Sequence, residues 1–287
     1  FGLCNAGQTY VRTMDQVLNG LPFVITYVDD IIIHSKTIEE HIQHINVVLD
    51  RIKEANMLIN INKSTFCVQE IEFLGCLVSQ RQVRLSPAKV DSVKNLVAPR
   101  NIKELRSVLG FANAYKRFIP NVAQKTVHMR KLLAKDCRFR WSSQCQQEYE
   151  VLKQCLSNPQ VMFQPDFELP FTIRTDASGE ALGAILLQYD ADGNEQTVYY
   201  ASRCLSKAEK KWHSTELEAL AIVFGCETFR HYIFLTEFTV ESDAGCLQWL
   251  MNQRKPGRLT RWALRLLEFS FKIVHIGEGD KRLTLEL

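Results

Sequence analysis

The chain has 287 residues, of which 46% are hydrophobic, and a formal net charge of +3. This length favours two or three packed units, and this composition excludes a disordered or fibrous protein. No apolar run reaches the roughly 18–20 residues that a membrane-spanning helix needs, so we expect no membrane association. The nine cysteines form no Cys-x-x-Cys pair, and no secretion signal is evident. We therefore expect reduced thiols and an intracellular protein.

Two adjacent carboxylates, Asp29 and Asp30, stand between the apolar runs 23–26 and 31–33. Strand-favouring residues on both sides predict a buried β-hairpin with the carboxylates at its turn. Neighbouring carboxylates repel each other unless a cation holds them, and hard oxygen ligands suit Mg²⁺. An ordinary Asp-rich turn explains the same residues, so the pattern alone leaves both interpretations open.

The rest of the first eighty residues predicts a sheet with a covering helix. Thr37-x-x-Glu40 is a capping-box pattern, and we expect the helix that follows it to pack an apolar stripe against the sheet. That stripe consists of Ile38, Ile42, Ile45, Leu49 and Ile52. Residues 60–79 are rich in Ile, Phe and Val, and they predict further strands.

The region 81–140 is strongly basic, with fifteen Lys and Arg residues and three acids. Ser86-Pro87 predicts the start of one helix, and Asn101-x-x-Glu104 predicts the start of a second. The apolar stripe of the second helix is Leu105, Val108, Leu109, Ala112 and Tyr115. A basic middle region suits a polyanion, although a helical domain with a solvated basic face explains it too.

A second set of carboxylates begins at Asp176, near the end of a predicted strand over 171–178. Residues 183–188 and 198–203 predict two more strands, and Ser206-x-x-Glu209 predicts the start of a long helix. That helix carries Glu216 and Glu218. Both flank its apolar stripe, so periodicity does not choose between them.

A further predicted strand, 238–243, ends at Asp243. Three acids that separate elements deliver to one end of a sheet form an unstable cluster of like charges, which Mg²⁺ neutralises. Such a cluster serves two-metal catalysis, in which one ion activates water and the other stabilises the leaving oxygen. The alternative for each acid is an ordinary solvated surface carboxylate.

Spaced motifs along the chain closely resemble the reverse transcriptase and ribonuclease H of gypsy-class LTR-retrotransposon Pol polyproteins. The motifs are Phe-Gly-Leu-Cys-Asn-Ala-Gly-Gln-Thr-Tyr at 1–10, Tyr-Val-Asp-Asp at 27–30, Phe-Leu-Gly at 73–75, and the segments 104–120, 171–178 and 218–223. The resemblance implies a multidomain α+β fold. It comprises a partial polymerase palm sheet with its covering helix over 1–80, a helical thumb and linking segment over 81–164, and a ribonuclease H-like mixed sheet with helices over 165–287.

For the polymerase, the resemblance implies that Asp29 and Asp30 hold the metal ions. Tyr27 would then lie under the primer terminus and Gln8 near the incoming nucleotide. The other residues expected to bind nucleic acid are Phe73, Leu74 and Gly75, which resemble the primer grip, and Lys103, Arg106, Lys116 and Arg117 of the thumb. The family's first polymerase carboxylate and its fingers lie upstream of Phe1, so we expect no polymerisation by this chain alone.

For the nuclease, the resemblance implies that Asp176, Glu218 and Asp243 are catalytic metal ligands. Glu218 is preferred over Glu216 because the family's glutamate precedes a run like Ala-Leu-Ala-Ile-Val at 219–223. Thr284 falls where the family has its fourth acid, and Glu286 is the alternative ligand. The implied cofactors are two Mg²⁺ or Mn²⁺ ions in each site.

The implied activities are RNA-directed DNA synthesis by the parent enzyme and cleavage of RNA in RNA–DNA hybrids. The implied partners are the template–primer duplex, the hybrid, deoxynucleoside triphosphates and the rest of the Pol polyprotein, in a cytoplasmic particle or the nucleus. One alternative is a catalytically decayed nucleic-acid-binding relic, which keeps the fold without competent sites. Another is a stand-alone ribonuclease H whose polymerase remnant only binds substrate. The sequence does not indicate an oligomeric state.

Overall fold

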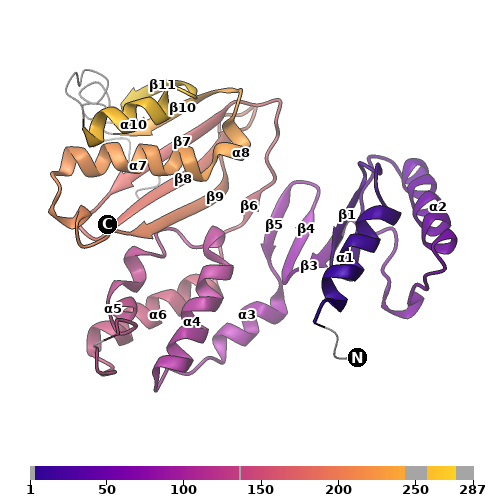
Figure 1. Ribbon diagram of the computed structural model, residues 1–287, viewed down its shortest axis with the longest axis horizontal. Helices are drawn as coiled ribbons and strands as arrows, with labels where there is room; N and C mark the ends of the chain where they lie inside the picture. Colours follow the sequence, from indigo (N-terminus) through magenta and orange to yellow (C-terminus); the bar gives the residue numbers. More distant parts are fainter. Residues whose placement is uncertain (1–3, 136, 243–256, 276–287) are drawn as a thin grey trace. The chain divides into compact units, whose positions relative to one another are not determined.

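The computed structural model describes residues 4–135, 137–242 and 257–275 (Figure 1). The chain has an α+β fold and divides into two compact units, residues 1–71 and 72–287. Each unit has its own buried hydrophobic residues. Among the described residues, no helix is both long enough and apolar enough to cross a membrane.

The first unit is a β-hairpin with helices packed on it. Its elements are α1 (Ala6–Val17), β1 (Val24–Tyr27), β2 (Asp30–Ile33), α2 (Ile38–Glu54) and the 3₁₀ helix η1 (Ile61–Lys63). The strands are antiparallel, with Val24 opposite Ile33 and Tyr27 opposite Asp30. Its core consists of Met14, Leu18, Val48 and Ile52.

The hairpin is half exposed, so the prediction of a buried hairpin is wrong. Residues of β1 alternate between partly buried and exposed, and the side chains of Ile25 and Tyr27 are 50% and 52% exposed. The reason is that the helices cover one face of a two-stranded sheet and leave its other face to water.

The predicted start of α2 is confirmed, because the N–H of Glu40 donates to Thr37 Oγ1 at 3.2 Å. The capping box is only half formed, since the Glu40 carboxylate accepts from the Lys36 N–H and not from the Thr37 N–H. Its predicted apolar stripe is wrong in part, because α2 packs through Val48 and Ile52 and stacks His44 on Phe23 at 3.6 Å. The exposed members of the stripe are Ile38, Ile42 and Leu49.

Residues 60–69 contain no strand before β3, contrary to the prediction from their apolar content. This stretch forms the turn η1, and its apolar side chains are exposed, with Ile61 at 74%. Asn and Ser residues within it favour local turns over a strand ladder.

The second unit begins with a four-stranded sheet in the order β3-β4-β5-β6, in which β3 starts within the last residues of the first unit. Its strands are β3 (Glu70–Phe73), β4 (Cys76–Ser79), β5 (Gln82–Leu85) and β6 (Met162–Phe163). Between β5 and β6 lie α3 (Pro87–Lys94), α4 (Ile102–Ala114), η2 (Lys116–Phe118), η3 (Gln124–Thr126), α5 (Val127–Lys131) and α6 (Ser143–Ser157).

The two helix starts predicted in this region are confirmed. Pro87 is the first residue of α3, and the N–H of Glu104 donates to Asn101 Oδ1 at 2.9 Å at the start of α4. The stripe of α4 is buried as predicted at Leu105, Val108, Leu109 and Ala112. Tyr115 is partly buried at the helix C-cap.

A five-stranded mixed sheet follows, in the order β11-β10-β7-β8-β9. Its strands are β7 (Phe171–Ala177), β8 (Ala181–Tyr189), β9 (Glu195–Cys204), β10 (Glu237–Ser242) and β11 (Ser270–His275). Strands β7, β8 and β9 are antiparallel neighbours, whereas β10 runs parallel to both β7 and β11. Its helices are η4 (Glu209–Lys211), α7 (Ser214–Thr228), α8 (Arg230–Ile233) and α10 (Arg258–Leu266).

The predicted start of the long helix α7 is wrong. The Ser206–Glu209 pair does form reciprocal hydrogen bonds, at 2.7 and 3.3 Å, but these close the turn 206–209 that leads into the short 3₁₀ helix η4. Helix α7 begins at Ser214 with His213 as its N-cap. Trp212 and His213 lie between the two and have extended backbones, so the chain restarts its helix there.

Both faces of the five-stranded sheet are covered. Helix α7 packs on one face and lies close to β7 at Gly225, where an added Cβ would lie 3.1 Å from Ile173 and Thr175 side-chain atoms. On β8 and β9, Ile185, Leu187 and Tyr200 belong to the same core as α4 and α6. The helical segment and the sheet therefore share a core within the second unit.

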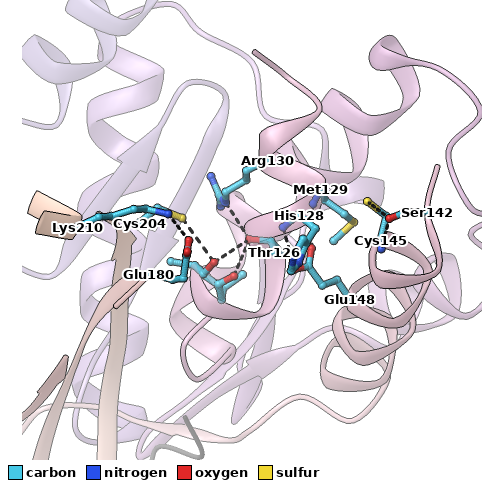
Figure 2. Close-up of polar contacts among 12 residues, drawn as sticks. Thr126, His128, Met129, Arg130, Ser142, Cys145, Glu148, Glu180, Cys204 and Lys210 are labelled. Carbon is cyan, nitrogen blue, oxygen red and sulfur yellow. Dashed lines mark hydrogen bonds and ion pairs between the residues drawn. The ribbon is translucent and has the colours of Figure 1, made fainter. Parts of the chain in front are cut away.

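Polar contacts join the same two parts (Figure 2). The N–H of Ala123 donates to Ser202 Oγ at 3.0 Å, and the thiol of Cys204 donates to the Ala123 carbonyl. In Figure 2, the Glu180–Lys210 ion pair lies beside the segment that carries Thr126. These contacts lie near the end of the sheet where Asp176 is located. The helical segment and the five-stranded sheet therefore both fix the backbone there.

Candidate active sites

The turn that carries Asp29 has an unusual backbone. Tyr27 pairs with Asp30, so only Val28 and Asp29 connect the strands. Val28 has φ 55°, in the left-handed region that β-branched residues rarely adopt. Strain of this kind persists where the surrounding structure enforces it, and it is frequent at functional sites.

Asp29 and Asp30 are both exposed, and neither carboxylate makes a hydrogen bond or ion pair with another described residue. Tyr27 is exposed beside them, and Thr26 links β1 to α1 through Asp15 Oδ1 at 3.4 Å. Gln8 is exposed on α1. The turn therefore presents two adjacent carboxylates that no described lysine or arginine neutralises.

These carboxylates fit a hard divalent cation, because Mg²⁺ in phosphate chemistry is commonly held by one or two carboxylates, with water and substrate phosphates as its other ligands. Across the part of the chain that the structure describes, no three His, Cys, Asp or Glu side chains gather into a metal-binding group. Asp29 and Asp30 would therefore supply only part of a metal's ligands.

The predicted primer-binding residues form the turn between β3 and β4. Leu74 and Gly75 have φ of 51° and 77°, the left-handed pair that tight two-residue hairpins require. Leu74 is half exposed, whereas Phe73 is partly buried. An added Cβ on Gly75 would also lie 2.6 Å from the end of the Tyr115 side chain, so the left-handed backbone and this close contact both favour glycine here.

The predicted thumb residues fall into two classes. Lys103 and Arg106 are exposed on α4, as phosphate-binding residues need to be. Lys116 and Arg117 are partly buried in η2. The Arg117 guanidinium lies 5.2 Å from the centre of the Tyr199 ring on β9, a cation–π contact that gives it a packing role in this unit.

Two predicted nuclease residues lie on elements that pack together. Asp176 is the penultimate residue of β7, opposite Gly183 of β8, and Glu218 lies in the second turn of α7. Glu218 is seven residues before Gly225, so both lie on the same side of α7. Because Gly225 contacts β7, Glu218 lies on the side of the helix that faces the sheet.

Both of these acids are partly buried, and each has an interaction partner. Strands β7 and β10 are parallel neighbours, so their C-terminal residues Ala177 and Ser242 lie at the same edge of the sheet. Asp243, the next residue after β10, lies outside the described residues. Thr284 and Glu286 also lie outside them.

The neighbouring acid Glu216 has a different environment. Its carboxylate accepts hydrogen bonds from the His213 N–H at 3.3 Å and from Arg258 Nη2 at 2.5 Å. These contacts give Glu216 a role at the helix start, which supports the choice of Glu218 as the metal ligand. Arg258 was missed by the sequence reasoning because no local pattern connects it with a helix start so distant in the chain.

A second group of charges stabilises the middle of the sheet. Arg174 binds both Glu195 and Glu241 at 2.7 Å, and Tyr189 donates to Glu241 at 3.0 Å. Burial disfavours the charged form of Arg174, but its hydrogen bonds to the two glutamates outweigh burial and raise its pKa. Burial together with the Glu241 charge raises the pKa of Tyr189 to about 12. Arg174 therefore stays charged at neutral pH, and its network joins four strands, β7, β8, β9 and β10.

Comparison with known families gives two matches. Residues 166–269 match the family described as the RNase H-like domain found in reverse transcriptase, and residues 1–78 match reverse transcriptase (RNA-dependent DNA polymerase).

Two curated relatives are Pol polyproteins. The retrovirus-related Pol polyprotein from transposon 297 of Drosophila melanogaster is 36% identical over 280 residues, which cover 96% of this chain and 26% of that protein. The transposon Tf2-3 polyprotein of Schizosaccharomyces pombe is 36% identical over 255 residues, which cover 87% of this chain and 19% of that protein. The chain thus spans about a quarter or less of these relatives.

Solved structures of a foamy viral protease–reverse transcriptase share the fold. The complex with double-stranded DNA has a TM-score of 0.81 and 22% identity, over 96% of this chain and 59% of that chain. The complex with an RNA/DNA hybrid has a TM-score of 0.79 and 22% identity, over 96% of this chain and 38% of that chain. With both family matches and the transposon relatives, the chain belongs to the reverse transcriptase–ribonuclease H family of LTR-retrotransposon Pol polyproteins.

Proposed function

We propose that this chain is the palm-end, thumb and nuclease part of a gypsy-class Pol protein, and that it cleaves RNA in RNA–DNA hybrids. The observation that carries the nuclease proposal is the placement of Asp176 and Glu218 on β7 and on the sheet-facing side of α7. Assignment of Glu216 to the helix cap supports this pairing.

In this proposal Asp176, Glu218 and Asp243 hold two Mg²⁺ or Mn²⁺ ions, with Glu286 as the candidate fourth ligand. When bound, such ions supply an activated water and stabilise the leaving oxygen of the displaced RNA strand. Asp176 and Glu218 hold their positions through β7 and α7, which pack together in one buried core. Partial burial of Asp176 and Glu218 strengthens their attraction for a cation relative to an exposed pair.

For the whole Pol protein we propose RNA-directed DNA synthesis, in which Asp29 and Asp30 hold metal ions that bind deoxynucleoside triphosphates. Tyr27, Gln8 and the 73–75 turn would contact the template–primer. Exposed Lys103 and Arg106 would bind duplex phosphates without reading sequence. An intracellular location, in a cytoplasmic particle or the nucleus, goes with these substrates.

The test is cleavage of a labelled RNA–DNA hybrid in Mg²⁺, with Asp176→Asn as the inactive control. The proposal expects cleavage by the natural chain and none by the variant. If the folded protein binds the hybrid in a salt-sensitive way but does not cleave it, the nuclease proposal fails. That result would instead support the decayed nucleic-acid-binding relic.

A further inference from the structure

Arg258, the first residue of α10, connects that helix to the first turn of α7. Its Nη2 donates to Glu216 at 2.5 Å, and its guanidinium carbon lies 3.8 Å from the centre of the Trp212 ring. Trp262 lies 5.6 Å from the same guanidinium. The side chains of Arg258 and Glu216 are 34% and 20% exposed, so this pair is better shielded from water than a surface ion pair.

Glu216 is itself part of the start of α7. Its carboxylate accepts from the His213 N–H, while the Thr215 N–H donates to His213 Nδ1 at 3.3 Å. These reciprocal bonds determine where the helix begins. Because a helix has a fixed rise and rotation for each residue, they also determine where Glu218 lies, two residues later.

Helix α7 is fixed at a second point by Gly225, which packs on Ile173 and Thr175 of β7. The two fixed points bracket Glu218. Loss of the first point would remove the polar contacts on the N-terminal side of Glu218 and leave this segment held by core packing from Leu217 onward. A displacement of about 1 Å at a reacting group is enough to lower a rate by roughly a hundredfold.

We propose that Arg258 is a positioning residue of the nuclease: through Glu216, and with Trp212 as its platform, it fixes the first turn of α7 and so the carboxylate of Glu218. This inference rests on the proposed function and adds to it a residue that does not touch substrate or metal. Glu216 acts with Arg258 in this role and is not a metal ligand.

The test compares Arg258→Gln with Arg265→Gln in the full chain. Arg265 is the matched control because it also joins α10 to α7, through Glu227 at 3.1 Å, but at the opposite end of α7. Its side chain is 58% exposed. Arg258→Lys keeps the charge but lacks the planar group that stacks on Trp212, so it separates charge from stacking.

Three measurements report on the role of Arg258. Hydrogen exchange at Leu217 and Glu218 reports on the first turn, because the Leu217 N–H bonds to the His213 carbonyl. Mn²⁺ affinity, measured by electron paramagnetic resonance, reports on the metal ligands. Hybrid cleavage gives kcat and KM. For Arg258→Gln we expect exchange at these amides about fivefold to tenfold faster, as for the loss of a helix cap.

We also expect Arg258→Gln to weaken Mn²⁺ affinity severalfold and to lower kcat by about tenfold, with the KM for the hybrid unchanged. Arg258→Lys is expected to fall between the natural chain and Arg258→Gln, and Arg265→Gln to match the natural chain. The double variant Glu216→Gln with Arg258→Gln is expected to be no worse than either single variant.

Unchanged exchange in Arg258→Gln would overturn the inference, as would additive losses in the double variant. A raised KM with unchanged kcat would overturn it in favour of direct contact with nucleic acid. If the natural chain neither binds Mn²⁺ nor cleaves the hybrid, the proposed function fails and the nuclease role of Arg258 fails with it. In that case exchange at Leu217 and Glu218 still decides whether Arg258 fixes the helix start.

Discussion

The two candidate sites differ in how the chain builds them. Asp29 and Asp30 are sequence neighbours, one in an exposed two-residue turn and the other at the first position of β2. Asp176 and Glu218 lie far apart in the chain, on a strand and a helix held together by a buried core. A local site depends on the backbone of a few residues, whereas an assembled site depends on every contact that positions its elements.

The largest expected effect is on hybrid cleavage, when a carboxylate of one site or of the other is replaced. Asp176→Asn is expected to lower Mg²⁺-dependent hybrid cleavage by at least roughly a hundredfold, because a neutral amide is a poor ligand for Mg²⁺. Asp29→Asn is expected to leave cleavage within about twofold, since that carboxylate belongs to the other site. Initial rates at saturating hybrid measure both.

As a control, the affinity of the same two variants for the hybrid is measured in EDTA. This affinity should equal that of the natural chain. Equal losses of cleavage in Asp176→Asn and Asp29→Asn would contradict the separation of the sites. They would show that the two carboxylates serve one activity.

The second prediction concerns the packing on which the assembled site depends. Gly225→Ala is expected to lower the free energy of unfolding of the second unit by about 1–3 kcal/mol, because its new Cβ would crowd Ile173 and Thr175 at 3.1 Å. Gly110→Ala is the control, since nothing lies within 4 Å of its new Cβ on α4. That control is expected to add about 0.5–1 kcal/mol through helix propensity. Urea unfolding followed by tryptophan fluorescence measures both changes.

Stabilisation by Gly225→Ala equal to that by Gly110→Ala would show that α7 has room to move away from β7. The assembled site would then tolerate more movement than the close approach at Gly225 implies.

Local sequence patterns predicted the local features of both units. The caps at Thr37 and Asn101 and the buried stripe of α4 depend on residues within one or two turns, so the sequence contains them directly. The strands that end near Asp176 and Ser242 were predicted in the same way, from runs of apolar residues.

Features set by tertiary packing were not predictable. Helix α7 starts at Ser214 because His213 and Arg258 engage Glu216, and Arg258 is remote in sequence. The predicted apolar stripe of α2 was wrong in part because stacking of His44 on Phe23 selects which side of the helix packs. Periodicity gives the spacing of a helix face but does not identify the partner that covers it.

The third prediction concerns acid. Hydrogen bonds from Arg203 lower the pKa of Glu209 from its ordinary value of 4.5 to about 2, so ionised Glu209 stabilises the second unit. This stabilisation is fully present above about pH 4.5 and is lost as the pH falls towards 2. Glu209→Gln is expected to cost about 1–2 kcal/mol at pH 7 and to flatten the loss of stability between pH 4.5 and 2.

Thermal unfolding across that pH range measures the effect. Glu237→Gln, at an exposed position on β10, is the control and should keep the pH dependence of the natural chain. A Glu209→Gln variant with the same pH dependence as the natural chain would show that Arg203 does not hold this carboxylate ionised.

The smallest effect is expected at the local site. Val28 has φ 55°, which is costly for a β-branched residue, whereas glycine adopts it freely but loses more entropy on folding. Because these terms oppose each other, Val28→Gly is expected to stabilise the hairpin by no more than about 1 kcal/mol. The control Val47→Gly, at an exposed position on α2, should destabilise the first unit by about 0.5 kcal/mol. Hydrogen exchange in β1 and β2 distinguishes the effects of the two substitutions. Equal destabilisation by both would show that the backbone of the turn is not strained. The turn would then need no unusual backbone conformation to present its carboxylates.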